Sequence, residues 1–191
     1  ADNNTAVGRA ALGANTTGAS NAAVGPYALQ SNTTGDANIA MGHSALGNTT
    51  TGSYNTAVGR DSLTTNTTAE LNTAMGYRSL YLNTTGELNT GIGGYALNKT
   101  TTGVRNTAVG YTSMNSNTTG NQNTALGSHS LDANTTGGAN TAVGYQALTG
   151  NTTAADNTSV GYNSLVANTT GASNTAVGSG ALNANTTASN N

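Results

Sequence analysis

The sequence contains no cysteine, tryptophan or phenylalanine, and its only proline is Pro26. Without cysteine the chain can form no disulfide, and it offers no thiolate to a metal ion. Charged residues make up 6% of the sequence, and seven acidic against five basic side chains give a net charge of −2. So few basic residues cannot line a nucleic-acid groove or form a polybasic membrane patch. No apolar run is long enough to cross a bilayer, and no signal peptide is recognisable at Ala1. We therefore expect neither nucleic-acid binding nor membrane insertion.

What the chain has instead is one seventeen-residue unit, repeated. Each unit begins with Asn, and this Asn recurs every seventeen residues from Asn4 to Asn174 without insertion, so that eleven units fill residues 4–190. A fixed short period is typical of a solenoid, in which each coil buries its apolar side chains only when neighbours stack on it. A disordered tract would not constrain insertions in this way. The sequence thus predicts a single repeat domain over residues 1–191.

Two positions of the unit carry the large aliphatic side chains. Position four is Val, Met, Ile or Leu in every unit, from Val7 to Val177, and position nine is Leu except at Met114. We predict that these two columns form opposite walls of a narrow core, each within a short strand. The fold class is therefore all-β, a parallel β-solenoid (β-roll) of eleven coils with two short strands per coil.

Two bends should separate these strands. Position five is Gly in every unit, which is typical of a turn with positive φ. The second bend is expected at the Asn-Thr-Thr-Gly segment, for example residues 15–18, although Ala replaces this Gly in three units. With successive strands about 4.8 Å apart, eleven coils form a rod roughly 50 Å long.

The motif Asn-Thr-Ala-Val-Gly-Tyr at residues 140–145 resembles the head repeats of trimeric autotransporter adhesins of the YadA type, and similar repeats occur in phage tail fibres. The Ala-aliphatic-Gly core carries the resemblance through the whole array, for example at residues 57–59 and 176–178. The resemblance implies a left-handed parallel β-roll, three copies of which pack around an axis at a cell surface.

Candidates for catalysis and metal binding are sparse. His43 and His129 lie five coils apart, roughly 24 Å at the spacing of β-strands, which is too far for a shared catalytic or metal site. Glu70 and Glu87 share position sixteen on adjacent coils, where a calcium ion could relieve their repulsion, but the glycine-rich pattern of calcium-binding β-rolls is absent. We expect no enzyme activity, no cofactor and no metal site.

A row of tyrosines is a candidate binding surface. Tyr77, Tyr111, Tyr145 and Tyr162 all occupy position six. Their rings could stack on a sugar or a protein partner, or simply cover the first bend with their hydroxyl groups in water.

The Asn-Thr-Thr bend carries an Asn-x-Thr sequon in every coil, which suggests glycosylation by N- or O-linkage on a surface edge. In the third and sixth coils the Asn moves toward the N-terminus and the sequon is kept, as expected of a glycan acceptor but not of a packed ladder. Turn chemistry alone also favours Asn and Thr here. The candidate acceptors are Asn15, Asn32, Asn48, Asn66, Asn83, Asn98, Asn117, Asn134, Asn151, Asn168 and Asn185.

These observations favour a non-enzymatic, extracellular or cell-surface structural protein that forms a fibre or filament. Both end coils would expose unpaired edges, so we expect the array to continue in a longer chain, to stack end to end with other copies or to form a homotrimer. The alternative is an adhesin-like module that binds surface carbohydrate or ice through its Tyr or Thr/Asn rows. A flat ice-binding array prefers Thr-x-Thr to the Thr-Thr pair found here.

Overall fold

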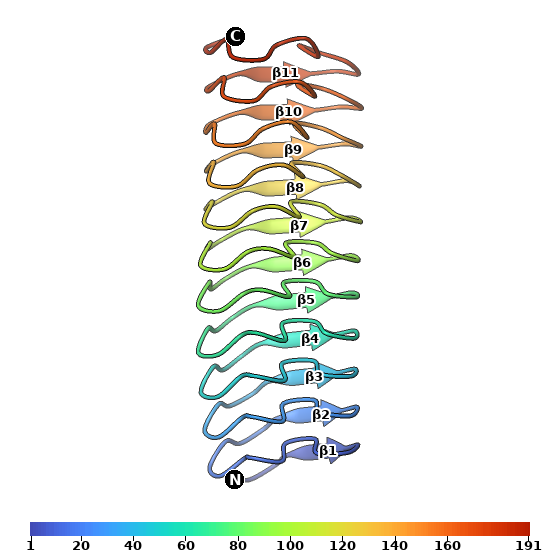
Figure 1. Ribbon diagram of the computed structural model, residues 1–191, viewed down its shortest axis with the longest axis vertical. Coiled ribbons are helices and arrows are strands. Elements are labelled where there is room, and N and C mark those ends of the chain that lie inside the picture. Colours follow the sequence, from blue (N-terminus) through green and yellow to red (C-terminus); the bar gives the residue numbers. More distant parts are fainter.

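The computed structural model describes residues 1–191 and is a rod of stacked coils, with the two chain ends at opposite ends of the stack (Figure 1). Eleven parallel strands, one from each coil, form a single sheet in sequence order. The predicted all-β parallel solenoid is therefore confirmed, and no helix that could cross a membrane is present. The strands are β1 Thr5–Val7, β2 Ala22–Val24, β3 Ile39–Met41, β4 Thr56–Val58, β5 Thr73–Met75, β6 Thr90–Ile92, β7 Thr107–Val109, β8 Thr124–Leu126, β9 Thr141–Val143, β10 Thr158–Val160 and β11 Thr175–Val177.

Successive strands pair residue for residue with the repeat. Thr141 of β9 pairs with Thr158 of β10, and Val143 pairs with Val160. Every position of the unit therefore forms a column along the rod, and the seventeen-residue phase of the sequence becomes the register of the sheet. An inserted residue would move one coil out of this register.

The prediction that position four lines the core is wrong. Its side chains face solvent along the outer face of the sheet, where Met41 is 46% and Leu126 is 48% exposed. Position three points inward instead, and Ala40 and Ala125 are completely buried. A three-residue strand with one inward side chain alternates out, in, out, and the narrow coil leaves room inside only for a small residue.

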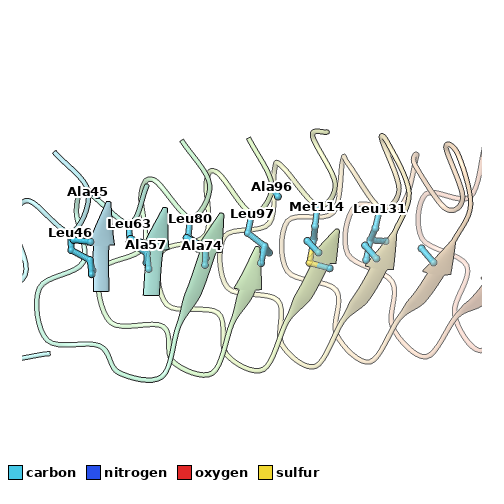
Figure 2. Close-up of a cluster of buried hydrophobic side chains, with 14 of the residues drawn as sticks. Ala45, Leu46, Ala57, Leu63, Ala74, Leu80, Ala96, Leu97, Met114 and Leu131 are labelled. Carbon is cyan, nitrogen blue, oxygen red and sulfur yellow. The ribbon is translucent and has the colours of Figure 1, made fainter. Parts of the chain in front are cut away.

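The prediction that position nine forms a core wall is confirmed. Leu29, Met114 and Leu165 are fully buried, as are the equivalent residues of the coils between them. These side chains form a row beside the inward alanines of the strands, as seen for Leu63, Leu80, Ala57 and Ala74 in Figure 2. One wall of the core is thus leucine and the other is alanine.

The second strand predicted around position nine is absent, because this segment is a run of turns. In the ninth coil the N–H of Ala147 donates to the carbonyl of Gly144 (3.3 Å), and the N–H of Thr149 donates to the carbonyl of Gln146 (3.4 Å). Gln146 and Leu148 have a φ of 53°, as the third residue of a type II turn requires. These turns aim the leucine inward at a left-handed backbone position.

The first bend falls at position five, as predicted. Gly144 has a φ of 131°, and a Cβ there would lie 2.5 Å from the carbonyl oxygen of Gly161 in the next coil. The coils approach each other through bare backbone at this column, which explains why only glycine occurs in it.

Candidate functional site

The Asn-Thr-Thr bend is built on two columns of buried asparagines. The side-chain nitrogen of Asn21, at position one, donates to the carbonyl of Gly35 at 2.8 Å. The side-chain nitrogen of Asn32, at position twelve, donates to the same carbonyl at 3.0 Å and to Oδ1 of Asn15 in the preceding coil at 3.0 Å. Both columns therefore converge on one carbonyl oxygen and use both of its lone pairs. This pattern cross-links the bend within a coil and between coils.

The prediction that the sequon asparagines lie on the surface is wrong for most of them. Except at Asn48, their Nδ2 atoms donate to a backbone carbonyl of the rod, so these nitrogens are not free to accept a glycan in the folded chain. Asn48 alone is exposed, and Asn15, Asn98 and Asn185 are half-buried. The fully buried ones are Asn32, Asn66, Asn83, Asn117, Asn134, Asn151 and Asn168. Glycosylation of the eleven candidate acceptors stays a prediction, and Asn48 is the one whose side chain is open to solvent.

The displaced sequons of the third and sixth coils have a different meaning from the one predicted. Thr49 and Thr100 replace Asn at position twelve and are fully buried. The position-twelve asparagines of successive coils are joined by side-chain hydrogen bonds into an asparagine ladder. Each of these threonines interrupts the ladder, because a threonine has no amide to donate to the coil before it. Accordingly, Oδ1 of Asn32 and Oδ1 of Asn83 are buried without a hydrogen-bond partner. In the sequence, the place of an asparagine at position twelve of the unit indicates that it is buried. The presence of a sequon does not.

The tyrosine row is part of a longer aromatic column. Where position six is Gly94 or Ser128, position seven supplies the ring through Tyr95 or His129. Neighbouring rings have centroids 5.2 to 6.2 Å apart, most of them edge to face. The column comprises Tyr77, Tyr95, Tyr111, His129, Tyr145 and Tyr162. Position six, from which the row was predicted, supplies four of these six rings.

Tyr145 and Tyr162 differ from the rest of the column. Their rings are stacked, with centroids 5.6 Å apart and an interplanar angle of 13°. Tyr145 is 44% and Tyr162 is 57% exposed. This pair presents aromatic surface and hydroxyl groups together to solvent.

A small charged cluster lies beside the aromatic column. Asp61 is mostly buried and has Arg60 Nε at 3.5 Å and Arg78 Nε at 3.6 Å. The guanidinium of Arg78 also lies 5.2 Å from the ring centre of Tyr77, a cation–π contact. Partial burial raises the pKa of Tyr95 above its ordinary value, and the neighbouring Tyr77 hydroxyl raises this pKa further. With His43 Nδ1 3.9 Å from the Asp61 carboxylate, the cluster ties the side chains of the third, fourth and fifth coils together.

The histidines do not meet in the fold. His43 contacts the ring of Tyr27, whereas His129 lies within the aromatic column and beside Asp132, 3.5 Å from its carboxylate. No group of three or more His, Cys, Asp or Glu side chains lies close enough to hold a metal ion. Glu70 and Glu87 occupy neighbouring coils at the surface, as their shared position predicts.

The outer face of the sheet is the most extended apolar feature. Position four forms a column of aliphatic side chains along all eleven strands, beside the mostly threonine column of position two. Its most exposed members away from the two end coils are Leu126, Met41 and Met75 at 48%, 46% and 42%. A continuous apolar face of this kind marks an interaction surface more often than a solvated one.

No protein-family model, curated protein or solved structure matches the chain.

Proposed function

We propose that the chain is a non-enzymatic structural protein, a β-solenoid segment of an extracellular fibre or cell-surface filament that carries glycans on its Asn-Thr-Thr edge. Its repeat motif resembles that of the head repeats of YadA-type adhesins. The observation that carries the proposal is that successive coils are joined by the same hydrogen bonds at each junction. The resulting rod has an unpartnered aliphatic column along its length.

The junctions suit a rod that bears load along its axis. Between the ninth and tenth coils, the N–H of Thr141 donates to the backbone carbonyl of Asn157 (2.8 Å), and the N–H of Leu148 donates to the backbone carbonyl of Ser164 (3.0 Å). In the opposite direction, Gly161 N–H donates to Val143 at 2.8 Å. Since these bonds repeat at successive junctions, further coils of the same chain or of a second copy would add in the same way.

The aliphatic column supports sideways association of rods, including the trimer that the family resemblance implies. A face roughly 50 Å long and about 10 Å wide buries about 500 Å² on each copy, near the lower limit for a stable interface. A net charge of only −2 puts little electrostatic repulsion in the way.

Electron cryomicroscopy and sedimentation velocity test this assembly. We expect fibres or bundled rods from the unaltered chain. A triple variant of the outer face, Met41→Lys, Met75→Lys and Leu126→Lys, should give single rods, because three buried lysines would have no partners. The matched control is Gln30→Lys, Asn48→Lys and Asn183→Lys, which adds the same charge at exposed positions away from the strands. A monomeric unaltered chain at high concentration, or equal behaviour of the two variants, would contradict the proposal.

A second candidate function is carbohydrate binding by the stacked pair Tyr145 and Tyr162. Both rings are about half exposed, so that the apolar face of a sugar ring can pack against them. Titration calorimetry with a panel of oligosaccharides should detect binding that Tyr145→Ala and Tyr162→Ala abolish. Tyr54→Ala is the control, since Tyr54 is 60% exposed and lies outside the aromatic column. Equal binding by the control and the double variant would rule out this site.

A further inference from the structure

Four positions of the repeat hold the same residue in all eleven coils. They are Asn at position one, Gly at position five, and Thr at positions thirteen and fourteen. Other positions have diverged widely, and position sixteen alone contains Ala, Asp, Ser, Glu, Val, Asn and Gly. The coils have therefore changed enough that an unchanged position calls for a physical reason.

Three of the four have a structural reason. The Asn at position one is buried, and its side chain accepts from the backbone of the next coil, as Asn38 Oδ1 does from Asn55 N–H at 3.0 Å. The Gly at position five has a positive φ in every coil, and in all coils but the last it has no room for a Cβ. The Thr at position thirteen donates its hydroxyl to the carbonyl of the next coil, as Thr118 does to Thr135 at 3.0 Å. The same bond is made at each of the ten coil junctions.

Position fourteen has no such reason. Its eleven threonines are all exposed, and none of their hydroxyl groups forms a hydrogen bond within the chain. At this position the fold uses only the backbone, for example Thr119 N–H to Thr135 at 3.2 Å, which any residue but proline can supply. The residues of this outer threonine column are Thr17, Thr34, Thr51, Thr68, Thr85, Thr102, Thr119, Thr136, Thr153, Thr170 and Thr187.

The outer threonine column is not a by-product of the asparagine sequons. Thr51 and Thr102 follow Thr49 and Thr100, so neither has an asparagine two residues before it. Both are nevertheless threonine. In the other coils the asparagine two residues earlier has its side-chain nitrogen bonded inside the rod.

We propose that the outer threonine column is an array of O-glycosylation sites. In each coil the threonine Oγ1 would attack the anomeric carbon of an activated sugar, a nucleotide diphosphate or lipid diphosphate sugar. The bond from that carbon to the diphosphate breaks, the diphosphate leaves, and the hydroxyl proton passes to a base of the glycosyltransferase. The sugar chemistry rests on the glycosylated-fibre function proposed above, whereas the assignment of the site does not depend on fibre formation.

The surroundings of the outer threonine column favour covalent attachment over reversible binding. The rod has no pocket, and each coil but the last offers only one free hydroxyl in its Thr-Thr pair, because the other threonine hydroxyl is bonded to the next coil. A transferase brings its own binding site and needs only an exposed acceptor. Attached sugars would also hydrate a surface with very few charges, which charge alone cannot keep dispersed.

Mass spectrometry with fragmentation that locates each modification tests the proposal on the chain isolated from its own cells. We expect sugar masses on threonines of the outer column, such as Thr119 and Thr136, and bare side chains on their neighbours Thr118 and Thr135. Unmodified threonines throughout the column, or sugars confined to asparagines, would overturn it. Thermal hysteresis of an unmodified chain would assign the column to ice instead. Assembly of the rods is measured separately, so either proposal can fail alone.

A pair of variants in the unglycosylated chain tests the premise that the hydroxyl groups of the outer threonine column have no structural role. Thr118→Val removes a hydroxyl that bonds to the next coil and should lower the midpoint of thermal unfolding. Thr119→Val removes a hydroxyl without a partner and should leave the midpoint unchanged. Equal losses from the two variants would show that the outer column has a structural role and would overturn the assignment.

Discussion

At the scale of the residue, the fold depends on an unusual backbone conformation. Each coil has left-handed residues at positions seven, nine and seventeen, and most of them are not glycine; examples are Gln146, Leu148 and Asp156, with φ of 53°, 53° and 60°. A left-handed residue with a Cβ costs roughly 1–2 kcal/mol relative to an ordinary helical conformation. At position nine the buried leucine side chain offsets this cost, but at exposed positions nothing comparable does.

Replacing an exposed left-handed residue with glycine should therefore stabilise the rod. Ala139 is exposed and has a φ of 54°. Ala139→Gly removes the Cβ strain at the cost of a more flexible unfolded chain, and we expect a net gain of about 0.5–1 kcal/mol in the free energy of unfolding. Denaturant titration would measure it. Ala133→Gly, at a position without positive φ, is the control and should lower stability. If both variants lose stability, strain is not significant at position seventeen.

At the scale of the coil, the sequence predicts the period, the glycine bend and the buried leucine, but it misplaces the strand. Aliphatic residues such as Val143 were expected inside because they are the most apolar. The range of residue sizes found at each position is a better indication of which side chains are buried. Position three contains only Ala, Gly or Ser, as at Ala142, Gly91 and Ser159, whereas position four accepts Val, Ile, Leu and Met. A column restricted to small residues is tightly enclosed, and a column that varies in size faces open space.

Two neighbouring substitutions test which side of the strand is enclosed. Ala142→Val adds two methyl groups to a fully buried site and should cost about 1–3 kcal/mol through overpacking. Val143→Ala removes the same volume from the outer face and should change the free energy of unfolding by less than about 0.5 kcal/mol. Chemical denaturation of isolated rods provides both values. The opposite ranking would place the core on the other face of the sheet.

The asparagine ladder could not be predicted from the sequons, because a sequon describes a local tripeptide and the ladder joins residues seventeen apart. The fold nevertheless shows where the ladder is incomplete. Thr49→Asn and Thr100→Asn would each supply a donor to the unpartnered Oδ1 of Asn32 or Asn83. Each change should raise the free energy of unfolding by about 1 kcal/mol, and the two gains should add because two whole coils lie between the sites. Asn134→Ala is the converse control, since it removes bonds to Asn117 and Gly137 and should be destabilising. No gain from either Asn variant would mean that the unpaired oxygens cost the fold little.

At the scale of the whole molecule, stability is a sum over coils and their junctions, because each coil contacts only its neighbours. Neither a wide core nor a disulfide is needed, which explains how a chain without Phe, Trp or Cys can fold. Most bonds between coils join residues at or next to the seventeen-residue spacing, such as Thr152 Oγ1 to the carbonyl of Thr169 at 3.2 Å. The length of a coil is therefore fixed, while the number of coils is not.

Deleting one complete coil should consequently be tolerated, whereas deleting one residue fewer should not. Removal of residues 140–156 brings the eighth coil onto the tenth, where Asn134 can accept from Asn168 as Asn151 did, while it still donates to Asn117. The shortened rod should keep the same circular dichroism per residue and lose only the stability of one coil and one junction. Removal of residues 141–156 leaves one surplus residue at that junction, which displaces the position-one asparagine from its bond to the preceding coil. Its unfolding midpoint should be clearly lower than that of the first deletion. Equal midpoints would show that the junctions tolerate a shift of register, and the strict phase of the sequence would then need a cause other than folding.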